Sequence, residues 1–214
     1  MIVLAILAPI AAYLIGSISF AVIFTKYFCK TDVREHGSGN AGTTNVLRVA
    51  GKTAGLLTFL CDALKGAVAA LLGLFVYKYL FYDNESLIMY GKYICAVACM
   101  LGHAFPIWFK FRGGKCAATS VGIFAVCCPI GIIVGLIGYG INMLTTKIVS
   151  MSTLIATVFV VGFSIGLNGF DGGKPDYVII ALSLIAGAIV FLRHKDNIKR
   201  LIKGEEKKLK VKKD

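Results

Sequence analysis

Long apolar stretches are the feature that most restricts how this chain can fold. They cover residues 2–25, 54–77, 87–107, 119–144, 152–167 and 177–192. A helix needs about 20 apolar residues to cross the hydrocarbon core of a bilayer, and these stretches approach or exceed that length. Only 16% of the residues are charged, against roughly a quarter in soluble domains. The sequence therefore predicts an all-α, polytopic integral membrane protein.

The stretch 119–144 decides how many times the chain crosses the membrane. It is longer than one crossing needs, and Pro129 within it favours a break. Positive charge follows the first stretch, and ten of the 23 Lys and Arg residues lie between Arg193 and Lys213. Both basic regions are expected inside the cell, which requires an odd number of crossings. A break near Pro129 gives about seven transmembrane helices, with the N-terminus outside and the C-terminus cytoplasmic.

The loops placed outside by this topology are poor in positive charge. They contain Asp83, Glu85, Asp171 and Asp176 against Lys78 and Lys174. The first apolar stretch has no basic leading region and no small-residue cleavage pattern, so we expect it to remain as a span. We expect a single transmembrane domain over 1–214, with a basic cytoplasmic tail over 193–214.

The net charge of +12 raises the question of nucleic acid. The basic residues gather at one end of a membrane chain, where they favour anionic lipid, and no platform of interleaved aromatic residues is present for stacking bases. We therefore expect membrane lipids and no nucleic acid as partners. The cysteines show neither a disulfide framework nor zinc-ligand spacing, and no metal or cofactor is expected.

Four polar segments fall on the predicted cytoplasmic side. They are residues 35–48, 109–119, 147–153 and 191–206. In the first, the glycines at 37, 39 and 42 allow tight turns, Ser38, Asn40, Thr43, Thr44 and Asn45 supply short donors, and Arg48 suits a phosphate. A solvated loop that uses its glycines only for turns is the alternative.

The other segments carry weaker signals of the same kind. Gly113, Gly114 and Lys115 resemble an anion-binding turn before a helix, although a juxtamembrane turn has the same composition. His194 and Asn197 share a face if the tail is helical. Asp62 and Lys65 are costly within lipid and indicate either an ion pair or a polar site. Together these segments predict an anionic, phosphorylated ligand at the inner surface.

Several of these motifs, in this order, resemble the acyl-phosphate-dependent glycerol-3-phosphate acyltransferase family, usually called PlsY. The resemblance rests on GSISFA at 16–21, SGNAGTTNVLR at 38–48, Asp62, Lys65 and Gly66, GHAFPIWFKFRGGK at 102–115, and RHKDNIKRLIKGEE at 193–206. The family usually has glycine and valine where this chain has Cys116 and Ala117. Cysteine reduces the backbone freedom just after Lys115.

The resemblance implies transfer of a fatty acyl group from acyl phosphate to the 1-hydroxyl of sn-glycerol 3-phosphate, giving lysophosphatidic acid and phosphate. It implies catalytic roles for Ser38, Arg48, Lys115, His194 and Asn197. It implies substrate-binding roles for Gly39, Asn40, Gly42, Thr43, Asn45, His103, Gly113, Gly114, Ser150 and Arg200, with Ser152 and Thr153 as alternative hydroxyls. The location implied is the bacterial inner membrane, with the active site facing the cytoplasm.

The sequence favours this interpretation over three alternatives. Acyltransferases that use acyl-CoA share an H-x-x-x-x-D motif, and none of His36, His103 and His194 is followed by an aspartate at that spacing. A transporter for organic phosphates predicts polar groups along a path to the outside, whereas these motifs gather on one face. A scaffold without catalytic activity leaves the glycine- and asparagine-rich motifs unexplained.

Overall fold

All secondary structure described in the chain is helical. The computed structural model describes residues 2–169 and 176–209, so Asp171 and Lys174 of the predicted outer loops lie outside the described residues. The helices are α1 (Ile2–Gly16), α2 (Phe20–Cys29), η1 (Val33–Glu35), α3 (Thr43–Leu80), α4 (Glu85–Ala104), η2 (Ile107–Phe109), α5 (Ala117–Cys127), α6 (Pro129–Thr146), α7 (Val149–Gly169), α8 (Tyr177–Arg193) and α9 (Lys195–Ile202). The described residues divide into two compact units, one over residues 2–123 and one over 124–209.

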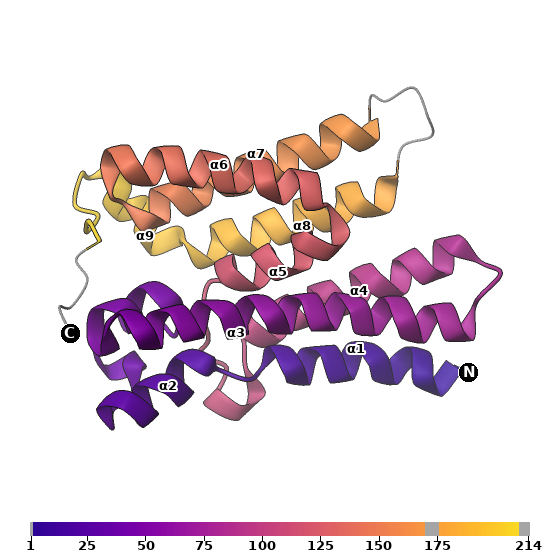
Figure 1. Cartoon of the computed structure of the whole chain (residues 1–214), viewed down its shortest axis with the longest axis horizontal. Helices are drawn as coiled ribbons and strands as arrows, with labels where there is room; N and C mark the ends of the chain where they lie inside the picture. Colours follow the sequence, from indigo (N-terminus) through magenta and orange to yellow (C-terminus); the bar gives the residue numbers. More distant parts are fainter. Residues whose placement is uncertain (1, 170–175, 210–214) are drawn as a thin grey trace. The chain divides into compact units, whose positions relative to one another are not determined.

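In the first unit, α1, α3 and α4 lie side by side (Figure 1). Their backbones approach closely at small residues: a side chain at Gly16 would collide with the Cys99 carbonyl, and one at Gly102 with the Tyr13 carbonyl. Small residues at helix contacts are typical of membrane proteins, because they let backbones pack without intervening side chains. The fold of this unit therefore depends on glycine at α1–α4 contacts.

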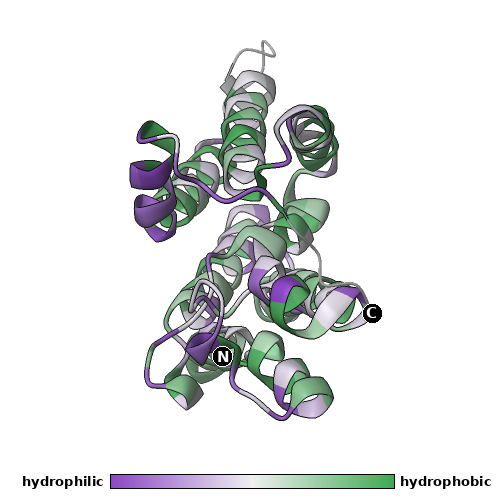
Figure 2. Cartoon of the chain, turned by 90° about the vertical axis from the view of Figure 1, so that its left-hand side faces the viewer, coloured by the Kyte–Doolittle hydropathy of each residue, from purple (hydrophilic) through white to green (hydrophobic). Residues whose placement is uncertain are grey.

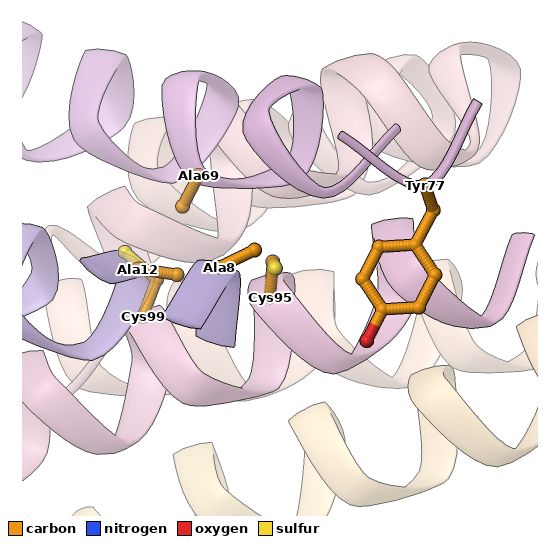
Figure 3. Packing of buried hydrophobic residues seen from close by; sticks show 6 residues of the cluster. All are labelled: Ala8, Ala12, Ala69, Tyr77, Cys95 and Cys99. Atoms are coloured by element: carbon orange, nitrogen blue, oxygen red, sulfur yellow. The ribbon is translucent and has the colours of Figure 1, made fainter. Parts of the chain in front are cut away.

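A buried cluster joins these three helices (Figure 3). It consists of Ala8, Ala12, Ala69, Tyr77, Cys95 and Cys99. The Tyr77 hydroxyl donates to the Ala5 carbonyl oxygen at 2.8 Å, which satisfies the one polar group that this ring carries into the core. Cys95 and Cys99 are free thiols that pack as small apolar side chains, as the sequence predicts.

In the second unit, α6 packs on α7 and α7 on α8. Pro129 is the first residue of α6, where a missing N–H costs nothing, and α5 ends two residues earlier at Cys127. The predicted break near Pro129 is confirmed. Helix α9 follows α8 after a bend of 63°.

Helix lengths match most of the predicted spans. Among the described residues, five helices are long and apolar enough to cross a membrane, or six if α8 and α9 form one bent span. The α1–α2 pair counts as one of them, over Ile2–Cys29. Helix α5 has only 11 residues, about 17 Å at 1.5 Å per residue, which is short for a crossing. The count of seven stays a prediction.

Apolar residues cover most of the long helices, and polar residues concentrate in the loops and in α9 (Figure 2). Many large apolar side chains are exposed on the helices, including Leu56, Leu60 and Leu64 on α3. Such surfaces are expected where lipid rather than water surrounds a protein. The prediction of an all-α protein with several membrane-spanning helices is confirmed at this level.

Candidate functional site

The loop before α3 is organised by the side chain of Asn45. Its Nδ2 donates to the carbonyl oxygens of Val33 and His36, each at 2.9 Å, and its Oδ1 accepts the amide N–H of Ser38 at 2.9 Å. Asn45 is 1% exposed. Both donors of the amide are used on the backbone, so Asn45 fixes the loop that presents Ser38. Ser38 itself is exposed.

Two glycines give this loop its tight turns. Gly37 and Gly39 have φ values of 63° and 70°, in the left-handed region that favours glycine. A side chain at Gly37 would also collide with the Asn45 Oδ1. The predicted use of these glycines for turns is confirmed.

The start of α3 collects donors next to this loop. Gly42 is the N-cap residue, and Thr43 begins the helix with its Oγ1 buried and without a hydrogen-bond partner among the described residues. The Asn40 amide nitrogen is 2.9 Å from the position that a Gly42 side chain would take. Arg48 is half-buried on the same helix, before an interruption at Gly51, where φ is 80°. Amides at a helix start with a guanidinium nearby suit an anion.

The turn at 113–115 packs against the same loop. The Gly114 amide donates to the His103 carbonyl oxygen at 3.0 Å. A side chain at Gly114 would lie 2.7 Å from the Ala41 carbonyl oxygen and would collide with the His103 ring. Gly113 is buried against the His103 carbonyl in the same way. Only glycine therefore allows this turn, which carries the half-buried Lys115, to lie beside the Ser38 loop.

Cys116 occupies a backbone conformation that favours glycine. Its φ is 64°, its side chain is fully buried, and its Sγ donates to the Met100 carbonyl oxygen at 3.2 Å. A left-handed residue other than glycine costs about 1–2 kcal/mol. Cysteine thus adopts the left-handed conformation of this turn, and its thiol is hydrogen-bonded to α4.

Arg34 links two segments of the predicted inner face. Its Nη1 donates to the Phe109 carbonyl oxygen at 3.0 Å, and its guanidinium lies 5.5 Å from the centroid of the Phe109 ring. Asp32 accepts from Arg34 at 2.7 Å. The side-chain hydrogen bond from Arg34 lowers the pKa of Asp32 below its ordinary value, against a smaller opposing effect of burial. The contacts of Arg34 with Phe109 thus connect η1 to η2.

In the second unit, Glu206 is the centre of a hydrogen-bond network. Its Oε1 accepts from Ser150 Oγ at 2.8 Å and from Asn197 Nδ2 at 2.6 Å, and its Oε2 accepts from Arg200 Nε at 2.6 Å. Burial raises the pKa of Glu206, but the hydrogen bonds from Arg200, Ser150 and Asn197 together outweigh it, so the pKa is lowered overall. The Leu209 amide also donates to the Lys147 carbonyl at 2.8 Å. The tail therefore folds back on the α6–α7 turn.

His194 lies between α8 and α9 as the N-cap residue of α9. It is 4% exposed, and its Nδ1 is 2.8 Å from the Val190 carbonyl oxygen. A carbonyl only accepts, so Nδ1 carries the proton in this contact. The tail is helical over Lys195–Ile202, with His194 as its N-cap residue and Asn197 in its first turn, which is the condition under which the sequence predicts a shared face.

The three hydroxyls at the start of α7 have different partners. Ser150 donates to Glu206, whereas Ser152 donates to the Ile148 carbonyl oxygen and to Asn142 Oδ1, each at 3.0 Å. Thr153 donates to the Val149 carbonyl oxygen at 2.9 Å. Of the three, only Ser150 is joined to the network that contains Asn197 and Arg200.

The sequence profile described as glycerol-3-phosphate acyltransferase matches residues 6–204. The chain belongs to this family. Glycerol-3-phosphate acyltransferase 2 of Bacillus anthracis is 39% identical over 204 residues, covering 95% of this chain and 98% of the relative. The glycerol-3-phosphate acyltransferase of Thermoanaerobacter sp. (strain X514) is 42% identical, covering 96% of each chain.

Solved structures of the family agree with this result. PlsY (YgiH), described as an integral membrane glycerol 3-phosphate acyltransferase, superposes in its glycerol 3-phosphate form with a TM-score of 0.81, at 32% identity over 96% of each chain. Its lysophosphatidic acid form gives a TM-score of 0.79 at 32% identity, over 95% of this chain and 94% of PlsY. The resemblance inferred from the motifs is confirmed.

Two parts of this arrangement were not assigned from sequence. Glu206 lies in a motif that carries the family resemblance, but the sequence assigns it no role, because it is one of several carboxylates in a mostly basic tail. The contact of Gly114 with Ala41 had no signal, because residues far apart in the chain and without charge leave no pattern. Within the first unit the structure brings the Ser38 loop and the Lys115 turn together. Within the second it brings together Ser150, Asn197 and Arg200.

Proposed function

We propose that this family member transfers a fatty acyl group from acyl phosphate to the 1-hydroxyl of sn-glycerol 3-phosphate, releasing lysophosphatidic acid and phosphate. The observation that carries the proposal is the close packing of Gly114 against Ala41. The Cβ atom of any other residue at position 114 would lie only 2.7 Å from the Ala41 carbonyl oxygen. This packing brings the turn of Lys115 beside the loop of Ser38 and the start of α3. Backbone amides, hydroxyls and cations gathered in this way suit phosphate groups.

The reaction needs positioning more than a protein nucleophile. Acyl phosphate is a mixed anhydride and is already activated. The 1-hydroxyl oxygen forms a bond to the acyl carbon, and the bond from that carbon to the phosphate oxygen breaks. Phosphate leaves with the electron pair, and the hydroxyl proton passes to a phosphate oxygen. No metal or cofactor is needed for these steps.

Each proposed residue has a role that its chemistry allows. Arg48 and Lys115 neutralise phosphate charge, and Ser38 donates a hydrogen bond to the same group. Gly39, Asn40, Gly42, Thr43 and Gly113 shape the loops or supply donors there. His194 orients glycerol 3-phosphate. The polar groups of glycerol 3-phosphate are bound by the three residues that surround Glu206, namely Asn197, Ser150 and Arg200.

The proposed topology has seven transmembrane helices, with the N-terminus outside and the active site facing the cytoplasm of a bacterial cell. The basic segment that contains Arg34 and Arg48 supports this topology, as does the basic tail, because positive charge prefers the inner face. Labelling of single cysteines introduced at 38 and 112 in intact cells tests it. Both are expected to resist an impermeant reagent until the membrane is opened, and labelling of either one from outside would contradict it.

The activity is tested with purified protein in lipid, labelled glycerol 3-phosphate, and either palmitoyl phosphate or palmitoyl-CoA. Lysophosphatidic acid is expected only from palmitoyl phosphate. Arg48→Ala and Lys115→Ala are each expected to lower kcat/KM by about 100-fold or more, because each removes a charge that faces a phosphate. Lys110→Ala, which removes a neighbouring cation outside the proposed site, is the control. Equal product from palmitoyl-CoA would overturn the proposed donor, and full activity of Lys115→Ala would overturn the site.

A further inference from the structure

Three buried polar side chains in the first unit have no part in the reaction described above. Asp62 and Lys65 lie on α3 with side chains 2% and 3% exposed, and Lys65 Nζ is 2.8 Å from Asp62 Oδ1. His103, at the end of α4, is 6% exposed and its Nδ1 is 3.7 Å from the same carboxylate oxygen. Charged groups within a membrane-spanning unit are costly to bury. Their presence calls for an explanation beyond packing.

At one end, this cluster reaches the break between α1 and α2. Lys65 Nζ donates to the Ile18 carbonyl oxygen at 2.7 Å and lies 5.7 Å from the centroid of the Phe20 ring. The helix is interrupted at residues 17–19, which leaves the Ile18 carbonyl without a helical partner. The hydrogen bond from Lys65 therefore stabilises the backbone at the break between α1 and α2. The same hydrogen bond fixes the position of the Lys65 ammonium group.

At the other end, the cluster reaches the turn that carries Lys115. The Nε2 edge of the His103 ring lies against Gly114, close enough that a side chain at 114 would collide with it. The His103 carbonyl oxygen accepts the Gly114 amide at 3.0 Å. The same residue thus faces Asp62 with one ring nitrogen and supports Gly114 with the opposite edge and its backbone.

We propose that Lys65, Asp62 and His103 form a positioning chain that fixes the Gly113–Lys115 turn, so that Lys115 faces its phosphate ligand. The inference rests on the proposed function and extends it to residues that do not touch substrate. His103, which the family resemblance implies as a substrate-binding residue, acts here through Gly114. An ion pair that only stabilises the helices is the alternative.

The proposal predicts coupling between His103 and Lys115. In the protein with Lys115, His103→Phe removes the contact with Asp62 and is expected to lower kcat/KM by about 10–100-fold, because a displaced binding group of this kind costs about that much. In the Lys115→Ala background the same substitution is expected to lower it by less than about threefold, since the group being positioned is gone. His103→Asn keeps a donor near Asp62 and is expected to restore part of the activity.

Removing the charges of Asp62 and Lys65 tests the other two residues of the positioning chain. Asp62→Leu with Lys65→Met removes both charges together and avoids an unpaired buried ion, so the double variant is expected to fold. It should nevertheless lose activity to the same extent as His103→Phe. Thr58→Val is the matched control on α3: Thr58 is fully buried and donates to the Ala54 carbonyl at 2.7 Å, so the control also removes a buried polar group.

A second readout does not depend on the reaction. Hydrogen exchange of the Gly114 amide reports its bond to the His103 carbonyl, and exchange is expected to be about tenfold faster in His103→Phe and in the double variant than in Thr58→Val. Unchanged exchange, or equal losses of activity with and without Lys115, would overturn the proposal. If the wild-type protein makes no product from acyl phosphate, the proposed function fails, and the exchange measurement alone decides the positioning chain.

Discussion

Two carboxylates in this protein are each surrounded by donors, but they are solvated very differently. Asp62 is buried in the first unit, 2.8 Å from a lysine that is also buried. Glu206 in the second unit accepts from three side chains, and one of them, Arg200, is 38% exposed. The Asp62 pair has lost its water almost completely, whereas the Glu206 network keeps contact with solvent through its cation.

This difference determines what each cluster can tolerate. A buried ion pair is held by one strong interaction that offsets a large desolvation penalty, so loss of one partner leaves an uncompensated charge. A carboxylate with three donors loses only part of its stabilisation when one donor is removed. We therefore expect that removing one charged partner of the Asp62 pair destabilises the protein strongly. Removing one donor to Glu206 should destabilise it only in part.

The largest effect is expected for Lys65→Met. It leaves Asp62 buried without its cation, which costs about 3–5 kcal/mol. Thermal unfolding in detergent and the yield of folded protein measure this loss. The double variant with Asp62→Leu should recover most of it, since neither charge is then buried. A Lys65→Met protein as stable as the wild type would mean that burial does not govern this cluster.

Glu206→Gln comes next. The carboxylate accepts at both oxygens, so an amide nitrogen at either position places a donor against Ser150 and Asn197 or against Arg200. Leaving such groups unsatisfied costs about 1–3 kcal/mol. The melting temperature and kcat/KM should both fall. Glu205→Gln is the control, because Glu205 is exposed and precedes Glu206 in the chain. Equal behaviour of the two variants would remove the proposed role of the network.

The pH dependence of stability also tests whether the Glu206 carboxylate stabilises the protein. The pKa of Glu206 is lowered from its ordinary value of 4.5 in the folded protein. Its contribution to stability is therefore fully present above that value and is lost as the pH falls through the lower, folded-state pKa. The difference in melting temperature between the wild type and Glu206→Gln should be constant well above pH 4.5 and should shrink as the pH falls below 4.5. A difference that grows on acidification would mean that the pKa is raised instead.

The sequence predicts the features that have a local signal, such as long apolar stretches, prolines, glycines and motifs. Apolar stretches of sufficient length identify the membrane helices, and Pro129 places the break before α6 because it lacks an N–H. The glycines at 37 and 39 predict turns, since left-handed backbone is open to them. Shared motifs identify the family because each of them fixes several residue types at fixed spacing.

Other features depend on contacts that leave no pattern. Asn45 fits the family's polar motif, but spacing does not reveal that its amide binds the backbone of its own loop. The break between α1 and α2 lies inside the first predicted span, where Ser17 and Ser19 alone do not signal a break, and the partner of the Ile18 carbonyl is a lysine 47 positions away. Cys116 reduces backbone freedom by its chemistry, yet the Met100 carbonyl holds it in the left-handed region.

The smallest effect is expected for Ser150→Ala. It removes one of three donors to Glu206 and should cost about 0.5–1.5 kcal/mol. In the Glu206→Gln background the same substitution should cost less, because the two residues share one hydrogen bond and their effects are not additive. Ser152→Ala provides the contrast: its hydroxyl binds Asn142 and Ile148, so its effect should be the same in both backgrounds. Additive effects for Ser150 would show that its hydroxyl does not act through Glu206.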